Sequence, residues 1–261
     1  MRKKLATMLL VVVMAVGLLP LSACGGTGET PGLDGSETPK QSDTPETTEP
    51  PETAYIPKGD VLATGEAGES VTWSFYSDGT LVISGTGPME DYTYDVWGGT
   101  IDDVPWGDYC DQIYTVILNG GVTSIGEAAF AGCRSLTDVT IPDSVTSIGE
   151  WAFYNCHNLT SVTIPDSVTS IEEGVFAHCT SLTSVTIPDS VTSIGDSAFL
   201  VCTELTSVTI PASVTSIEKN AFDYCDSLTD IYYGGISSQW KQINIGVNND
   251  PLLNATIHYN S

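Results

Sequence analysis

Apolar side chains recur along most of this chain at one constant spacing. The segment from Leu159 to Ile171 reads Leu-Thr-Ser-Val-Thr-Ile-Pro-Asp-Ser-Val-Thr-Ser-Ile, and it returns unchanged from Leu182 to Ile194. The first unit of the series is weaker, because Ile113 replaces the leucine and the proline is missing. The pattern extends in both directions into five units: 113–135, 136–158, 159–181, 182–204 and 205–227.

Within one unit, the spacing of apolar residues predicts a coil with three sides. Val139 and Ile141 alternate around a polar threonine, as in a half-buried strand. Pro142 then ends the strand, because it has no N–H to donate to the next coil. A single unit cannot bury its apolar groups, so we expect the 23-residue coils to stack into a solenoid. The other two sides, the second of them a short turn or helix, hold Val145 and Ile148, then Ala152, Phe153 and Cys156.

The unit resembles the BspA-like leucine-rich repeat, L-x-x-V-x-I-P-x-x-V-T-x-I-x-x-x-A-F-x-x-C-x-x, throughout residues 113–227. The flanking segments 71–87, 240–246 and 254–259 also resemble segments that accompany such repeats in surface proteins. The resemblance implies a β-rich leucine-rich-repeat solenoid in an extracellular protein that adheres to host matrix proteins, mucosal surfaces or other cells. It implies no particular binding residues, because the ligands differ between members.

Both ends of an open stack of coils expose unpaired backbone, so each end needs a cap. We assign residues 59–112 to an N-terminal β cap domain. Within it, residues 70–84 alternate apolar and polar positions on both sides of Ser77-Asp78-Gly79, which predicts a β-hairpin. We assign residues 228–261 to a C-terminal cap, with a last strand at about 255–259.

Residues 1–23 have the three parts of a lipoprotein signal peptide. Basic residues at 2–4 precede an apolar run that ends at Leu19. The tetrapeptide 21–24, Leu-Ser-Ala-Cys, resembles the bacterial lipobox. The resemblance implies cleavage before Cys24 and its lipidation, which would anchor the chain to the membrane. An ordinary signal peptide or a spanning anchor is the alternative, although the run is short for a span.

A tether of residues 24–58 follows the anchor. It consists of Gly, Thr, Pro, Glu, Ser and Asp with almost no apolar residues, and TPETTEPPET at 44–53 is typical. Such a segment cannot bury enough surface to offset its ordering entropy. We therefore expect a disordered linker that holds the folded part away from the membrane.

Seven cysteines raise the question of disulfides or a metal. Apart from Cys24, they follow one another at the spacing of the repeat, which predicts a ladder of buried free thiols that pack as small apolar side chains. Disulfides remain the alternative in an exported protein, although a bridge would twist the side chains out of their row. Zinc is not expected, because its four ligands must converge. The ladder is Cys110, Cys133, Cys156, Cys179, Cys202 and Cys225.

Repeated aspartates and two histidines have structural interpretations. Asp143, Asp166 and Asp189 follow the strand proline, where aspartate starts turns. Calcium bound between them is the alternative, but Ala212 interrupts the row. The two histidines, His157 and His178, are out of phase and do not stack, so we expect them to be exposed or satisfied by neighbours. No metal or cofactor is therefore expected.

Two sets of residues are candidates for ligand contact. The first is a row of outward threonines on the strand side, with a tyrosine in the next place, which presents hydroxyl groups to a glycan or, as a minor alternative, to ice. The second is an irregular aromatic loop that packing does not require. The row is Thr140, Thr163, Thr186, Thr209 and Tyr232, and the loop residues are Tyr92, Tyr94 and Trp97.

The net charge and the absence of catalytic motifs narrow the classes of function. With 33 acidic and 8 basic residues the net charge is −25, which disfavours nucleic acid as a partner. The sequence has no HExxH, GxSxG, P-loop or GxGxxG motif, so we do not expect an enzyme. We expect a cell-surface binding or adhesion lipoprotein whose ligand is an extracellular protein or glycan. A scaffold for envelope proteins of the same cell is the alternative, and a hydrolase is a remote one.

Overall fold

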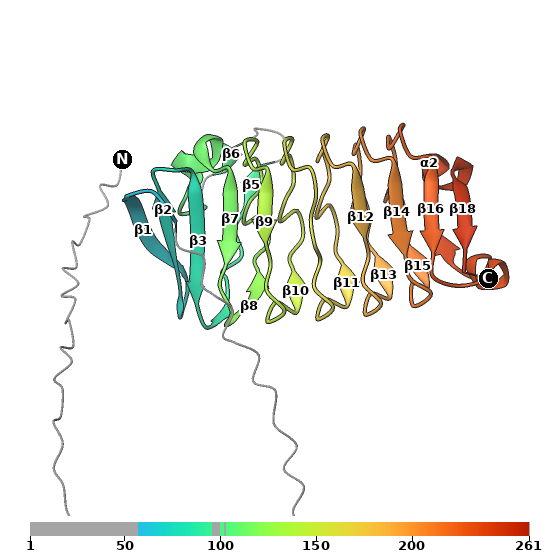
Figure 1. The fold of residues 1–261 in the computed structure, drawn as a ribbon, viewed down its shortest axis with the longest axis horizontal. Helices are drawn as coiled ribbons and strands as arrows, with labels where there is room; N and C mark the ends of the chain where they lie inside the picture. Colours follow the sequence, from blue (N-terminus) through green and yellow to red (C-terminus); the bar gives the residue numbers. More distant parts are fainter. Residues whose placement is uncertain (1–56, 96–99, 102, 261) are drawn as a thin grey trace, which may run out of the picture. The chain divides into compact units, whose positions relative to one another are not determined.

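The computed structural model describes residues 57–95, 100–101 and 103–260, which form a solenoid of stacked coils (Figure 1). Coil follows coil from β7 to β18, with each strand beside its equivalent from the preceding coil. The predicted solenoid of 23-residue coils is confirmed. In the described part of the chain, no helix has the length and apolar character needed to cross a membrane. The expected signal peptide, Cys24 and Trp97 lie outside the described residues.

One side of the solenoid is built by the longer strands. They form two sheets, in the orders β1-β2-β3-β7-β9 and β12-β14-β16-β18, and the third unit, which lies between them, pairs with β12 through a single bridge between Thr163 and Thr186. All neighbours are parallel except β1, β2 and β3, which form an antiparallel meander. The strands are β1 (Val61–Gly68), β2 (Val71–Tyr76), β3 (Thr80–Gly85), β7 (Thr115–Leu118), β9 (Asp138–Thr140), β12 (Ser184–Thr186), β14 (Ser207–Ile210), β16 (Asp230–Tyr233) and β18 (Thr256–Tyr259).

A second side carries short parallel strands, in the orders β10-β8-β4 and β11-β13-β15-β17. They are β4 (Gly87–Pro88), β8 (Val122–Ile125), β10 (Ser147–Ile148), β11 (Ser170–Ile171), β13 (Ser193–Ile194), β15 (Ser216–Ile217) and β17 (Asn244–Ile245). The remaining elements lie outside the repeats: β5 (Tyr94–Asp95), β6 (Thr100–Ile101), the 3-10 helix η1 (Gly107–Gln112), α1 (Ser237–Trp240) and α2 (Asp250–Asn254).

The third side consists of turns in every unit, not of helices. Two corners in each unit adopt the left-handed backbone conformation, as Trp151 at φ 58° and Asn155 at φ 60° do in the second unit. Between these corners an aromatic ring points into the core, and the rings of successive coils stack. Their centroids lie 5.1 to 5.6 Å apart along the column Trp106, Phe130, Phe153, Phe176, Phe199 and Phe222.

The cysteine ladder is buried as expected, but the expectation of free thiols throughout is wrong for its first pair. Cys110 and Cys133 form a disulfide, with their Cα atoms 4.4 Å apart. Cys110 belongs to η1, which replaces the regular turn at this point. In the later coils each free thiol instead donates to a phenylalanine carbonyl of the preceding coil, as Cys156 does to Phe130 at 3.2 Å.

Burial raises the pKa of each free thiol, in the case of Cys225 to about 12. The four thiols are therefore protonated at neutral pH and act as small apolar side chains. They are Cys156, Cys179, Cys202 and Cys225.

The N-terminal end is closed mainly by aromatic packing. The core-facing side of the β1–β2–β3 meander presents Trp73 and Phe75, whose rings contact Trp106 and Tyr109. Trp106 is fully buried, and its indole N–H donates to the carbonyl of Ala129 at 3.0 Å. The meander thus extends the core of the first coil.

The C-terminal end is closed mainly by a polar side chain. In each repeat the N–H of the core phenylalanine donates to a backbone carbonyl of the next coil, as Phe199 does to Ala221. After Phe222 the chain continues into the irregular coil of the cap, and the Phe222 N–H donates to Oδ1 of buried Asn249 at 2.9 Å in place of a backbone carbonyl. The amide group of Asn249 also donates to the carbonyl of Glu218 at 2.9 Å. The side chain of Asn249 therefore takes the place of the backbone carbonyl that a regular coil would supply.

Candidate ligand-binding surface

The predicted threonine row lies on the outer face of the strand side. Because the coils are parallel and in register, Thr163 is beside Thr186, Thr186 beside Thr209, and Thr209 beside Tyr232. Their side chains alternate with inward residues such as Val185, which belongs to the core. Thr140, Thr163 and Thr186 are exposed, and Thr209 is half-buried.

A second row of small polar residues runs parallel to the first, two positions earlier in each strand. Serines occupy its middle, and an aspartate stands near each end. The outer face of these strands therefore carries mainly hydroxyl groups, with one carboxylate near each end. Its members are Asp138, Ser161, Ser184, Ser207, Asp230 and Thr256.

An aromatic group ends the threonine row. The ring of Tyr232, 49% exposed, stacks on that of His258, with centroids 4.8 Å apart and planes 16° apart. Nε2 of His258 lies 2.6 Å from Oδ1 of Asp230, whose other oxygen accepts from the hydroxyl of Thr229 at 2.7 Å. These contacts with His258 and Thr229 lower the pKa of Asp230, so its carboxylate is charged at neutral pH.

This arrangement offers two kinds of contact to a ligand. The flat face of Tyr232 contacts apolar groups, such as the C–H groups of a sugar ring, at little entropic cost. The Asp230 carboxylate accepts hydrogen bonds, and the neighbouring hydroxyls both donate and accept. The set suits a polar ligand with apolar faces that spans several coils, which fits a glycan chain or an extended protein surface.

Periodicity alone missed His258 and Asp230. His258 pairs with Tyr232 in register although it stands out of phase with the repeat, because the cap helices make the last coil longer than a regular unit. Asp230 is in phase with a row of serines, and nothing in the sequence marks it as the partner of a histidine.

The aromatic N-terminal loop does not present its first candidate. The side chain of Tyr92 is 4% exposed, packs edge-on against Trp106 at 5.5 Å, and directs its hydroxyl to the carbonyl of Ala67 at 3.4 Å. Tyr92 is therefore a core residue and not a contact residue, which corrects the expectation. Tyr94 lies in β5, which pairs with β6. The expectation for Tyr94 and Trp97 as contact residues stays a prediction.

The two repeat histidines are half-buried and have partners. A ring nitrogen of His157 lies 3.1 Å from Oδ1 of Asn155, and the ring of His178 packs edge-on against Tyr154 at 5.3 Å. Burial lowers the pKa of both histidines, and nearby Arg134 lowers that of His157 further.

The exposed row Asp143, Asp166 and Asp189 follows the strand prolines, as expected of turn residues.

Comparisons with known proteins agree with this architecture. Residues 108–229 match the BspA type Leucine rich repeat region in six copies. No curated protein matches the chain.

Three solved structures are similar. A leucine-rich repeat protein from Eubacterium ventriosum has 33% identity over 68% of this chain and 45% of its own, with a TM-score of 0.58. A leucine rich cell surface protein from Faecalibacterium prausnitzii has 33% identity over 68% and 41%, with a TM-score of 0.51. The Leucine Rich Repeat protein of T. pallidum has 28% identity over 70% and 86%, with a TM-score of 0.50.

This chain spans less than half the length of the first two of these proteins. The match in sequence over residues 108–229 and the solenoid itself lead to one assignment: the chain is built on a BspA-type leucine-rich repeat region.

Proposed function

We propose that this protein is a cell-surface binding or adhesion protein that presents the outer face of its strands to an extracellular protein or glycan. The observation that carries the proposal is the exposed row of threonines that ends in the stacked pair Tyr232 and His258 beside Asp230. Buried repeat positions serve stacking, whereas this exposed aromatic group adds nothing to the core.

Two further observations support the proposal. A leucine rich cell surface protein from Faecalibacterium prausnitzii is among the similar structures. The stacked coils also form a rigid scaffold that holds an extended row of contacts in place, which reduces the entropy lost on binding. The proposal is binding without catalysis, and it rests on the exposed row and its aromatic end.

We also propose that Cys24 is lipidated and that residues 24–58 tether the solenoid to the membrane. Multiple acyl chains are needed for stable anchoring, because a single chain binds reversibly. The test is metabolic labelling with a fatty acid. Label should enter the wild-type protein and be absent from Cys24→Ser, which should also be released from the membrane.

The binding proposal is tested with an array of matrix proteins, mucins and glycans at physiological salt. We expect saturable binding by the full chain, reduced about tenfold or more by Tyr232→Ala, the size of effect expected for an aromatic anchor. Tyr114→Ala is the matched control, because Tyr114 is equally exposed (52%) but lies at the start of the first unit and outside the row.

Either of two results contradicts the proposal. Binding that Tyr114→Ala weakens as much as Tyr232→Ala does would mean that the strand face is not the site. No binding across the array by a well-folded protein, together with crosslinks only to envelope proteins of the same cell, would favour a scaffold role.

A further inference from the structure

The last strand of the solenoid, β18, is an open sheet edge. Among the described residues, β18 pairs with β16 on one side and with no strand on the other. Natural proteins protect such edges with charged residues, proline or bulges. β18 reads Thr-Ile-His-Tyr, has neither proline nor lysine, and keeps an unbroken register with β16. Its composition favours strand pairing.

The backbone of β18 has groups available for another strand. Thr256 N–H donates to the carbonyl of Thr229, and Asn260 N–H donates to that of Tyr233. Since successive residues of a strand point their backbone groups in alternate directions, the N–H and C=O groups of Ile257 and Tyr259 point to the open side.

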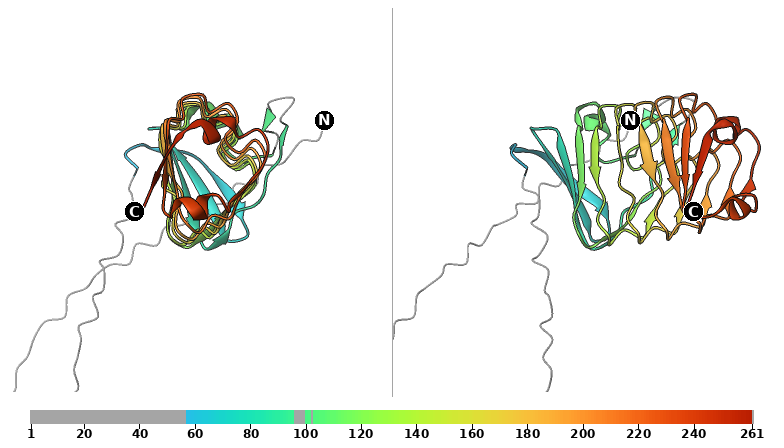
Figure 2. Two further views of the ribbon diagram at one scale, coloured as in Figure 1. Left: turned by 90° about the vertical axis from the view of Figure 1, so that its right-hand side faces the viewer. Right: turned by 45° about the vertical axis from the view of Figure 1, so that its right-hand side comes forward.

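The C-terminal cap exposes apolar side chains among its polar ones, although the end of a stack is expected to be polar. Figure 2 (left) looks onto this end, with β18 at one side and the two cap helices above and below. Four exposed apolar side chains belong to this cap: Ile236 (52%), Val247 (69%), Leu253 (56%) and Tyr259 (38%).

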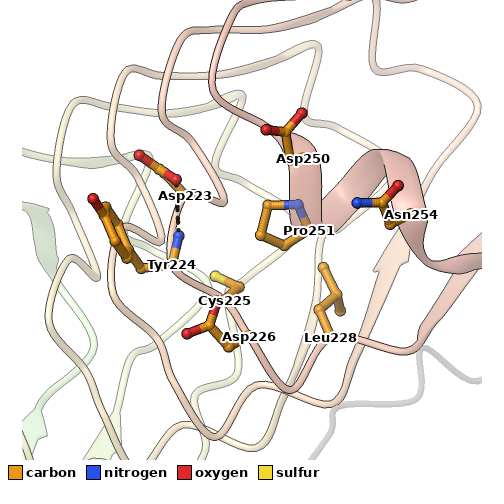
Figure 3. Close-up of a pocket in the computed structure, with 8 residues that line it drawn as sticks. All are labelled: Asp223, Tyr224, Cys225, Asp226, Leu228, Asp250, Pro251 and Asn254. Atoms are coloured by element: carbon orange, nitrogen blue, oxygen red, sulfur yellow. Dashed lines mark hydrogen bonds between the residues drawn. The ribbon is translucent and has the colours of Figure 1, made fainter.

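An acidic cavity lies at the beginning of β18 (Figure 3). It has a volume of about 440 Å³, and its lining includes Asn254, two residues before the strand, and the exposed ring of Tyr224. Its three carboxylates belong to Asp223, Asp226 and Asp250. Within the described part of the chain, neither of the two ion pairs involves them. A cationic side chain would complement their charge.

We propose that β18 is a strand-addition site for an extended, basic segment of a partner polypeptide. The added strand pairs with the outward backbone groups of Ile257 and Tyr259, and a lysine or arginine near it enters the acidic cavity. β-augmentation of this type takes its affinity from main-chain hydrogen bonds and its specificity from side-chain pockets. A second copy of this chain is disfavoured as occupant, because its net charge of −25 makes two copies repel.

This site adjoins the end of the threonine row, because His258 belongs to β18, but it uses the backbone of Ile257 and Tyr259 and the acidic cavity, so a different probe tests it. The probe is a library of short randomised peptides displayed on phage and selected on the full chain. We expect enriched peptides to combine alternating β-branched or aromatic residues with a lysine or arginine. The best peptide, made synthetically, should slow amide hydrogen exchange at Ile257 and Tyr259.

Two sets of variants locate the peptide. Asp226→Asn with Asp250→Asn should weaken its binding about tenfold or more. The matched control, Asp166→Asn with Asp189→Asn, makes the same change in charge at two exposed carboxylates of the repeats and should leave the affinity unchanged. Ile257→Pro should abolish binding, because proline removes one outward N–H. Exchange protection in the wild type gives the same information if this variant fails to fold.

Three outcomes overturn the proposal. The first is that no peptide is enriched. The second is that enriched peptides bind equally to both aspartate variants and protect other strands. The third is a dimer in solution that Ile257→Pro dissociates, which would assign the edge to a second copy. Loss of binding to the array of the previous section would leave this proposal untouched.

Discussion

The two ends of the solenoid solve the same physical problem by different means. At the N-terminal end the antiparallel β1–β2–β3 meander continues the core through large aromatic side chains, and the pairing of the edge strand β1 with β2 has two register irregularities. At the C-terminal end, Asn249 satisfies the last backbone groups, and β18 stays open. Side-chain packing closes one end, whereas at the other end a side-chain amide replaces a backbone group and the last strand keeps an unpaired edge.

The largest expected effect comes from the aromatic side chain at each end. Trp106→Ala removes a fully buried indole, its hydrogen bond to Ala129 and the first ring of the core column, so we expect a loss of about 3–5 kcal/mol in the free energy of unfolding. Trp240→Ala, at the less buried cap, should cost less. Urea denaturation followed by circular dichroism measures both. A larger loss for Trp240→Ala would reverse the comparison.

Next in size is the disulfide that reinforces only the N-terminal end. Replacing both Cys110 and Cys133 by serine should cost about 2–4 kcal/mol, since the bridge closes a loop of 23 residues. A reductant should destabilise the wild-type protein by a similar amount and leave the double variant unchanged. Cys156→Ser is the control, because its thiol is free and the hydroxyl keeps a donor for the Phe130 carbonyl. A wild-type protein insensitive to reductant would contradict the bridge.

A smaller loss is expected at the polar C-terminal closure. Asn249→Ala leaves the Phe222 N–H and the Glu218 carbonyl without their partner, which should cost about 1–3 kcal/mol. Amide exchange at Phe222 should become faster, while the disulfide end keeps its protection. Exposed Asn254 serves as the control, since Asn254→Ala should change stability by less than about 0.5 kcal/mol. Equal losses of stability in Asn249→Ala and Asn254→Ala would show that Asn249 does not close this end.

The smallest expected effect is a dependence of the protein's stability on pH. Burial, followed by the charges of neighbouring acids including Glu150, raises the pKa of Glu127 and Glu173 above 4.5. The folded state therefore takes up protons first, and these groups add stability as the pH falls from 7 toward 4.5. Burial opposes the shift at Asp196, but hydrogen bonds from Lys219, Ser197 and Asn220 lower its pKa below 3.8.

The contribution of Asp196 is therefore present above pH 3.8 and is lost as the pH falls through its folded pKa. Glu150→Gln should stabilise the protein at pH 7 and flatten the profile between pH 7 and 4.5, and added salt should reduce the difference. Urea midpoints at pH 5 and 7 measure this. A profile as steep as that of the wild type would show that Glu150 does not act on its neighbours.

The repeat region could be predicted from sequence because its contacts are periodic. Val139, Phe153 and their equivalents must stack on copies of themselves in the next coil, so the burial of one unit holds for all. The same rule placed the threonine row and Tyr232 on the outer face. It failed outside the regular units: Tyr92 is covered by Trp106, and Cys110 lies in a 3-10 helix and forms a disulfide with Cys133.

By itself, the sequence determined the solenoid, its coil length and the residues that line its core and its outer strand face. The tertiary structure decided how the stack ends: which cysteines pair, that the Asn249 side chain replaces a backbone acceptor, that His258 stacks on Tyr232, and that β18 has an unpaired edge among the described residues. The physical reason is that stacking repeats one local pattern at a constant offset, whereas each end depends on contacts between residues with no fixed separation along the chain.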